Sequence, residues 1–170
     1  MPDPRPRLVL IGPPGAGKTK VAKRVSRALG LPFTDTDKAI VAEHGEIAAI
    51  FSEHGEAHFR RLERDAVAAA LTTSGVVSLG GGAVLDPRTQ ADLGEHTVVL
   101  LTVSPEAVGP RIAGAKRPLL AAGGVAAWSA LVEQRRPVYE ALADATFDTS
   151  HTPMDVVAQR VIDWLIEEES

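Results

Sequence analysis

The residues with the clearest chemical potential are Gly12-Pro13-Pro14-Gly15-Ala16-Gly17-Lys18-Thr19, which fit the phosphate-binding P-loop pattern G-x-x-x-x-G-K-[ST]. Glycines allow such a loop to curl so that successive backbone N–H groups face phosphate oxygens. Lys18 is expected to reach the β- and γ-phosphates of a nucleotide, and Thr19 to hold Mg²⁺. A chance glycine-rich turn would match this pattern on the order of once in a hundred such chains or less. The motif therefore predicts nucleotide binding.

The segments on either side are the ones that a P-loop needs. The apolar run Leu8 to Ile11 is typical of a central parallel strand that is buried on both faces. From Lys18 to Leu29 the apolar residues keep helical spacing, and Gly30 is a natural helix end. The following helix adds its positive N-terminal end to the loop.

The rest of the chain alternates between strand and helix patterns. We expect further strands at 32–34, 76–79, 96–103 and 145–148. Helices are expected at 38–44, 46–53, 56–72, from about 87, at 105–113, 128–142 and 154–168. This alternation predicts an α/β fold with a parallel sheet between two helix layers. No repeat or linker indicates a second domain, so residues 1–170 are expected to form one P-loop kinase-like domain.

Other polar residues stand where a ligand could meet them. Asp35 and Asp37 follow a short strand, and open α/β sheets bind ligands at the carboxyl ends of their strands. On the helix expected at 56–72, Glu63 lies three residues after Arg60 and can orient the Arg60 guanidinium. Gly80-Gly81-Gly82 follows another strand, which indicates a flexible turn or close contact between a ligand and the backbone.

Composition narrows the class of protein. The chain is 45% hydrophobic and 24% charged, as soluble globular proteins are. Its formal charge of -4, with no basic stripe, argues against nucleic acid as a partner. No apolar run is long enough to span a membrane, and no signal peptide is recognised at the N-terminus. Because cysteine is absent, thiolate chemistry is excluded, and we expect a cytoplasmic protein.

Taken together, the motifs resemble those of the shikimate kinases. They are the P-loop, Asp35-Thr36-Asp37, Phe59-Arg60-Arg61-Leu62-Glu63, Gly80-Gly81-Gly82, Arg117-Pro118-Leu119-Leu120 and Arg135-Arg136-Pro137-Val138-Tyr139. Their order and spacing agree with this family from about residue 7 to residue 165. The resemblance implies a three-layer fold with a five-stranded parallel sheet of order 2-3-1-4-5. It also implies transfer of the γ-phosphoryl group of ATP to the 3-hydroxyl of shikimate, a step towards chorismate and the aromatic amino acids.

The resemblance further implies a role for each matched residue on the acceptor side. Asp37 would accept the proton of the substrate hydroxyl. Arg60 and Arg135 would bind the shikimate carboxylate through paired N–H groups, and Gly80, Gly81 and Gly82 would let shikimate approach the backbone. Arg135 and Arg136 are adjacent, so an error of one residue in this assignment stays open. The substrate-binding region would cover about 35–63.

On the donor side, the P-loop residues Gly12 to Thr19 would bind ATP, and Thr19 with Asp35 would hold Mg²⁺, the carboxylate through water. Arg117, in a glycine-bounded lid at about 112–124, would close over the phosphates. Arg111 and Pro153 stand at about the positions of the adenine-binding residues. Ser150-His151-Thr152 stands where relatives often have an arginine, and Thr19-Lys20 replaces the commoner Ser-Thr end of the loop.

Other interpretations remain open from the sequence. Asp35 and Asp37 could merely cap the helix after them, and Arg60 could be an ordinary surface residue. A gluconate kinase, or another small-metabolite kinase of this architecture, would share the P-loop without needing Asp37, Arg60, the three glycines and Arg135 together. A nucleotide-binding regulatory module, or a relative that has lost phosphoryl transfer, is the alternative from another class. The preferred hypothesis is a monomeric shikimate kinase that uses ATP and Mg²⁺.

Overall fold

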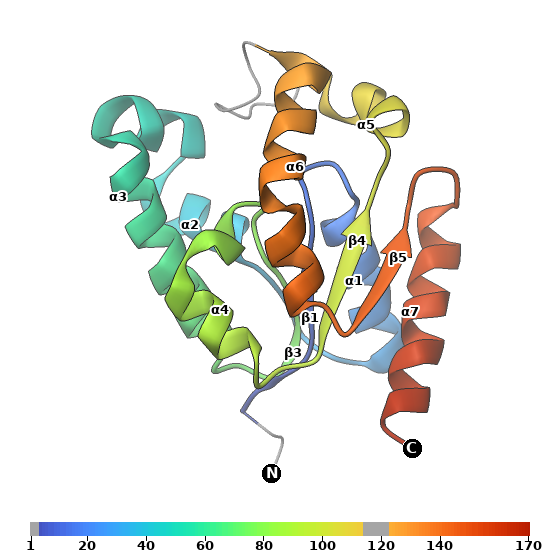
Figure 1. The fold of residues 1–170 in the computed structure, drawn as a ribbon. Helices are drawn as coiled ribbons and strands as arrows, with labels where there is room; N and C mark the ends of the chain where they lie inside the picture. The colour runs from blue at the N-terminus through green and yellow to red at the C-terminus, as the bar shows by residue number, and fades with distance from the viewer. Residues whose placement is uncertain (1–3, 114–122) are drawn as a thin grey trace.

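The computed structural model describes residues 4–113 and 123–170, which form a parallel sheet with helices on both faces (Figure 1). The strands are β1 (Pro6–Ile11), β2 (Phe33–Asp35), β3 (Gly75–Ser78), β4 (Val98–Thr102) and β5 (Ala145–Asp148). They are ordered β2-β3-β1-β4-β5, and all four pairings between neighbours are parallel. This confirms the predicted fold class and strand order.

Seven α-helices and one short 3-10 helix connect the strands within the described residues. They are α1 (Lys18–Leu29), α2 (Thr36–His44), α3 (Ile47–Ala70), the 3-10 helix η1 (Ala83–Leu85), α4 (Pro87–Leu93), α5 (Pro105–Ile112), α6 (Gly124–Leu142) and α7 (Met154–Glu168). Gly55 inside α3 has a non-helical φ of 84° and kinks the helix, which agrees with the predicted break there. The predicted lid falls mostly on residues 114–122, outside the described part of the chain.

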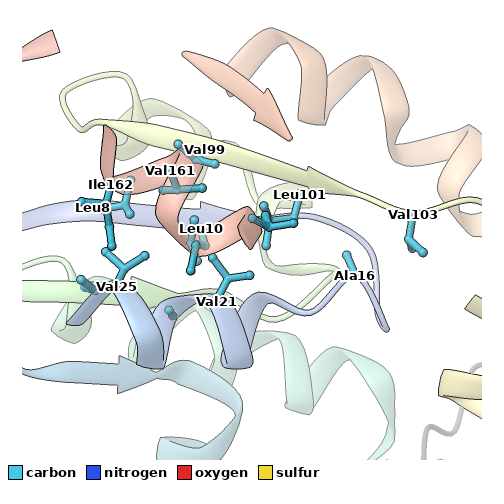
Figure 2. Close-up of a cluster of buried hydrophobic side chains, with 14 of the residues drawn as sticks. Leu8, Leu10, Ala16, Val21, Val25, Val99, Leu101, Val103, Val161 and Ile162 are labelled. Carbon is cyan, nitrogen blue, oxygen red and sulfur yellow. The ribbon is translucent and has the colours of Figure 1, made fainter. Parts of the chain in front are cut away.

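Alternate residues of β1 point to opposite faces of the sheet and hold two separate cores. Leu8 and Leu10 pack with Val21 and Val25 of α1, and with residues of β4 and α7 (Figure 2). Val9 and Ile11 pack on the other face, against residues of α3, α4 and α6. A strand that is apolar at every position is therefore buried on both sides, which is why β1 lies at the centre of the sheet.

Helix ends are stabilised by the residues that the sequence indicated. The side chain of Ser104 accepts a hydrogen bond from the Ala107 N–H at the start of α5, and Pro105 takes the first helical position. Gly30 ends α1 in the left-handed conformation, with φ 65°. These local signals fix where α1 ends and where α5 begins.

None of the helices described here is both long and apolar enough to cross a lipid bilayer.

Candidate active site

The P-loop lies between β1 and α1, at the carboxyl end of the central strand (Figure 1). Gly12 has φ 146°, and a Cβ there would collide with the Leu101 carbonyl oxygen of the neighbouring strand. Only glycine therefore allows the chain to turn so close to β4. The Lys18 Nζ donates hydrogen bonds to the carbonyls of Gly12, at 2.7 Å, and of Pro13, at 2.9 Å. These bonds keep the ammonium group at the P-loop, where it is expected to reach the β- and γ-phosphates.

Thr19 and Asp35, the two predicted metal ligands, lie in direct contact. The Thr19 hydroxyl donates to Asp35 Oδ2 at 2.8 Å, while Asp35 Oδ1 accepts from the Lys38 N–H at 3.2 Å and caps α2. Asp35 thus both caps α2 and contacts Thr19, whereas the sequence analysis treated helix capping and metal binding as alternatives. A hydroxyl and one carboxylate are hard oxygen donors that suit Mg²⁺, which usually keeps several waters and binds phosphate oxygens as well. The residues present therefore fit this ion.

A cavity of about 340 Å³ opens beside these residues. Its lining includes predicted site residues from four parts of the chain, namely Gly15, Gly17, Lys18, Thr19, Asp35, Asp37, Gly81 and Arg111. It also includes Lys20, Ser78, Leu79 and Met154. Lys20 had been noted from the sequence only as a departure from the commoner end of the loop, and no role had been predicted for Leu79 or Met154. The P-loop and Asp37 therefore border one cavity, as transfer between two ligands requires.

The three consecutive glycines make room for three different site groups. A Cβ on Gly80 would lie 2.5 Å from Asp37 Oδ1, and one on Gly81 would lie 2.9 Å from the Pro14 Cδ. A Cβ on Gly82 would overlap the guanidinium of Arg60. None of the three has a positive φ, so the missing side chain rather than backbone freedom explains them. From the sequence we expected the three glycines to let shikimate approach the backbone. We did not expect them to make room for side chains of the protein itself.

Arg60 and Glu63 form the ion pair that their spacing predicts, with Arg60 Nη1 donating to Glu63 Oε1 at 2.8 Å. Glu56 lies 3.5 Å from the other guanidinium nitrogen. The Glu63 carboxylate is buried, and burial raises the pKa of this carboxyl in spite of the opposing effect of Arg60. Arg60 is thus held next to Gly82 by Glu63, with its side chain partly buried.

The structure also separates the two adjacent arginines of α6. Arg135 is buried, with 4% of its surface exposed, and its charge acts on Glu63 and on the Tyr139 hydroxyl. Arg136 is exposed and pairs with Glu133 at 2.6 Å. Of the two, Arg135 is therefore the one that lies near Glu63 and Tyr139, and its role in binding stays a prediction.

Arg111 is bound to the P-loop by its own hydrogen bonds. Its Nη1 donates to the Gly15 carbonyl at 3.1 Å and to the Thr149 hydroxyl at 3.0 Å, and Nη2 donates to the Thr149 carbonyl at 2.6 Å. The Thr149 hydroxyl in turn donates to the Ala16 carbonyl at 2.7 Å. Arg111 therefore braces the loop in addition to lining the cavity. Pro153 is exposed as the residue before α7, and the next residue, Met154, lines the cavity.

Three buried side chains support this site without having been predicted to do so. Thr36 accepts a hydrogen bond from the Gly80 N–H at 3.2 Å. Tyr139 donates to the Gly81 carbonyl at 2.6 Å, and Trp128 donates to the Pro14 carbonyl at 2.8 Å. Their sequence signal was weak, because buried tyrosine and tryptophan on a helix face look like ordinary packing. Arg117 lies outside the described residues.

Comparisons with known proteins agree with this geometry. The family model described as "Shikimate kinase" matches residues 14–166. The shikimate kinase of Salinispora arenicola is 49% identical over 158 residues, which cover 91% of this chain and 95% of that protein. A solved shikimate kinase from Acinetobacter baumannii, in complex with shikimate, superposes with a TM-score of 0.90 at 29% identity. The superposition covers 97% of this chain and 94% of that one.

A gluconokinase from Sinorhizobium meliloti is a more distant neighbour, with a TM-score of 0.54 and 17% identity over 99% of this chain and 95% of the other. At that identity the likeness shows only a common fold. The sequence-level matches, by contrast, cover residues 14–166 with the family model and 91% of the chain at 49% identity with the Salinispora arenicola protein. The chain therefore belongs to the shikimate kinase family.

Proposed function

We propose that this chain transfers the γ-phosphoryl group of ATP to the 3-hydroxyl of shikimate, giving shikimate 3-phosphate and ADP. The observation that carries the proposal is the position of Asp37, which lines the same cavity as Lys18 and Thr19 of the P-loop. The reaction forms a bond from the hydroxyl oxygen to the γ-phosphorus and breaks the bond from that phosphorus to the oxygen bridging the β- and γ-phosphates. The displaced hydroxyl proton passes to a base.

Asp37 is the proposed base, because an ionised carboxylate beside the P-loop can accept the hydroxyl proton as the new bond forms. Gly80 leaves room for this carboxylate. Lys18 and the loop N–H groups would stabilise charge on the phosphates, and Arg117 would add a guanidinium to the same charge. Thr19 and Asp35 would hold Mg²⁺, which neutralises phosphate charge when it is bound.

Arg60 and Arg135 are the proposed carboxylate-binding residues. Both lie around the buried Glu63, which holds Arg60 by a 2.8 Å hydrogen bond and interacts electrostatically with Arg135. Their planar guanidinium groups offer paired N–H donors, which suit the carboxylate of the proposed acceptor. Gluconate also carries a carboxylate, so the choice of shikimate rests on the family and on the complete set of matched residues. Arg111 and Pro153 are the residues proposed to contact adenine.

The first experiment is an assay of ADP release with shikimate, gluconate and nucleoside monophosphates offered separately. We expect turnover with shikimate alone. Turnover with another acceptor and none with shikimate would refute the assigned substrate, and ADP binding without any turnover would indicate a regulatory module. Light scattering of the same preparation tests the proposed monomer. We place the activity in the cytoplasm, where ATP and Mg²⁺ are available.

Asp37→Asn tests the base. Turnover should fall by about 10² or more, because the amide cannot accept the proton, while ADP should bind as to the wild type. The matched control is Asp65→Asn, since Asp65 is exposed on α3 and does not line the cavity. Unchanged turnover in Asp37→Asn would disprove the role of Asp37.

Arg60→Ala tests the acceptor side. The KM for shikimate should rise about tenfold or more, because a charge-assisted hydrogen bond is lost, while the KM for ATP should stay within about twofold. Arg136→Ala is the control, since Arg136 is exposed and pairs with Glu133. Equal loss of affinity for both substrates would show that Arg60 is misplaced in this proposal.

A further inference from the structure

Helix α6 carries two buried hydrogen-bond donors that bind the backbone of two different loops of the site. Trp128 Nε1 donates to the Pro14 carbonyl at 2.8 Å, and the Tyr139 hydroxyl donates to the Gly81 carbonyl at 2.6 Å. Trp128 and Tyr139 are 1% and 2% exposed. They are eleven residues apart, close to three full helical turns, so they lie along one face of α6 together with the buried Arg135.

The two loops held by α6 also touch each other. The ring of Pro14 lies so close to Gly81 that a Cβ there would be 2.9 Å from the Pro14 Cδ. Pro14 belongs to the donor loop, and Gly81 lies between the glycines that make room for Asp37 and Arg60. The hydrogen bond from Trp128 therefore acts at the point where the donor and acceptor sides meet.

The bond also sets the direction of one phosphate-binding group. In a planar trans peptide the C=O and N–H point to opposite sides, so a Pro14 carbonyl directed towards Trp128 sends the Gly15 N–H the other way. Gly15 lines the cavity. The next carbonyl, that of Gly15, is held by Arg111 at 3.1 Å. Two successive carbonyls of the loop are thus held from outside by side chains of α5 and α6.

We propose that Trp128 is a positioning residue for the phosphoryl donor. The indole N–H of Trp128 fixes the Pro14–Gly15 peptide so that the Gly15 N–H faces the nucleotide phosphates. The proposal rests on the proposed function for its kinetic consequence, and on nucleotide binding alone for its main test. Burial makes this bond costly to lose, since no water replaces the missing donor at the Pro14 carbonyl. Packing alone would be satisfied by an apolar ring without an N–H group.

Trp128→Phe removes the indole N–H and keeps an aromatic ring in the core. The Kd for ADP, measured by calorimetry, should rise about tenfold, as expected when one N–H to phosphate contact is misdirected. The KM for ATP should rise in parallel, while the KM for shikimate should stay within about twofold. The matched control is Trp164→Phe, because Trp164 packs edge-on against Phe147, with ring centroids 6.5 Å apart. That variant should bind ADP as the wild type does.

A role in packing alone predicts a different result. Trp128→Phe would then unfold at a lower temperature but bind ADP with wild-type affinity, and this outcome would overturn the proposal. An equal increase in the KM values for ATP and shikimate would overturn it as well. Absence of wild-type turnover with shikimate would refute the proposed function instead, and the ADP measurement would still decide the role of Trp128.

A second measurement leaves Trp128 in place and does not depend on whether Trp128→Phe folds. Trp164→Phe makes Trp128 the sole tryptophan of the chain. Because its indole N–H is bonded to the nucleotide loop, we expect the fluorescence of Trp128 to change in intensity or wavelength on titration with ADP. Shikimate alone should change it much less. An emission spectrum that stays constant up to saturation with ADP would contradict the proposal.

Discussion

Gly80 offers the sharpest test of how the acceptor side is built, because one methyl group there would displace the proposed base. Gly80→Ala would place a Cβ 2.5 Å from Asp37 Oδ1, whereas ordinary van der Waals contact begins at 3.4 Å. The carboxylate oxygen must therefore move by about 0.9 Å, or the loop must move by the same amount. Asp37 has a short side chain at the start of α2, so its carboxylate can move only a short distance unless the backbone moves as well.

The expected loss follows from this displacement. A misplacement of about 1 Å at a reacting group can reduce the rate about 10²-fold. This corresponds to about 2.7 kcal/mol of lost transition-state stabilisation. The P-loop is not changed by the substitution, so the affinity for ADP should stay within about twofold of the wild type.

The assay is steady-state turnover with shikimate and ATP, accompanied by calorimetry with ADP and by thermal unfolding. The control is Gly109→Ala, because Gly109 lies within α5 and a Cβ there would meet Val125 Cγ2 at an ordinary 3.5 Å. This variant should be fully active and slightly more stable, since alanine is favoured over glycine in helices. Full activity of a folded Gly80→Ala variant would refute the argument that Gly80 exists to admit Asp37.

Two further predictions concern the groups that hold the ligands. Glu63→Gln weakens the hold on Arg60, so the KM for shikimate should rise about tenfold at unchanged KM for ATP. Because burial raises the folded-state pKa of Glu63 above its ordinary value of 4.5, the contribution of Glu63 to stability should fall as pH rises from about 4.5 through that raised pKa. Chemical denaturation of Glu63→Gln across this pH range should lack that fall, and an identical pH profile would contradict it. Thr19→Ala removes the hydroxyl that is proposed to hold the metal, so half-maximal turnover should need about tenfold more Mg²⁺, whereas Thr19→Ser should behave as the wild type. Equal Mg²⁺ dependence in all three proteins would exclude Thr19 from the metal site.

Much of the fold was predictable because its signals are local. The apolar runs of β1 and β4, the glycine after α1 and the cap at Ser104 depend only on residues close together in the chain. The strand order was implied by the resemblance of several motifs to one family, and the structure confirms it. The uneven part was α3, where Gly55 kinks a helix that is otherwise continuous from Ile47 to Ala70. The predicted break there is real, and the part of α3 after Gly55 packs against the sheet through Val67 and Ala70.

The chemistry of the site was predictable to the level of residue types. Lys18, Thr19, Asp35 and Asp37 border one cavity because they lie at or just after the carboxyl ends of β1 and β2, the two strands on either side of β3. Asp35 shows the limit of such reasoning, since one carboxylate caps α2 through one oxygen and binds Thr19 through the other. A sequence pattern offers the two roles as alternatives, while a carboxylate has enough acceptor positions for both.

The sequence by itself determined the P-loop, the kinase-like fold and the identity of the charged groups, because each depends on short-range patterns that a strand, a turn or a helix imposes. Tertiary structure alone decided why the three glycines are needed, which of Arg135 and Arg136 is buried, and that Trp128 and Tyr139 hold two site loops. These features depend on which atoms meet across 22 to 114 residues of chain, and steric exclusion and directional hydrogen bonds act only once those atoms are in contact. The P-loop motif therefore specifies a phosphate site, whereas the packing of α6 and the glycine loop around it arranges that site for two ligands.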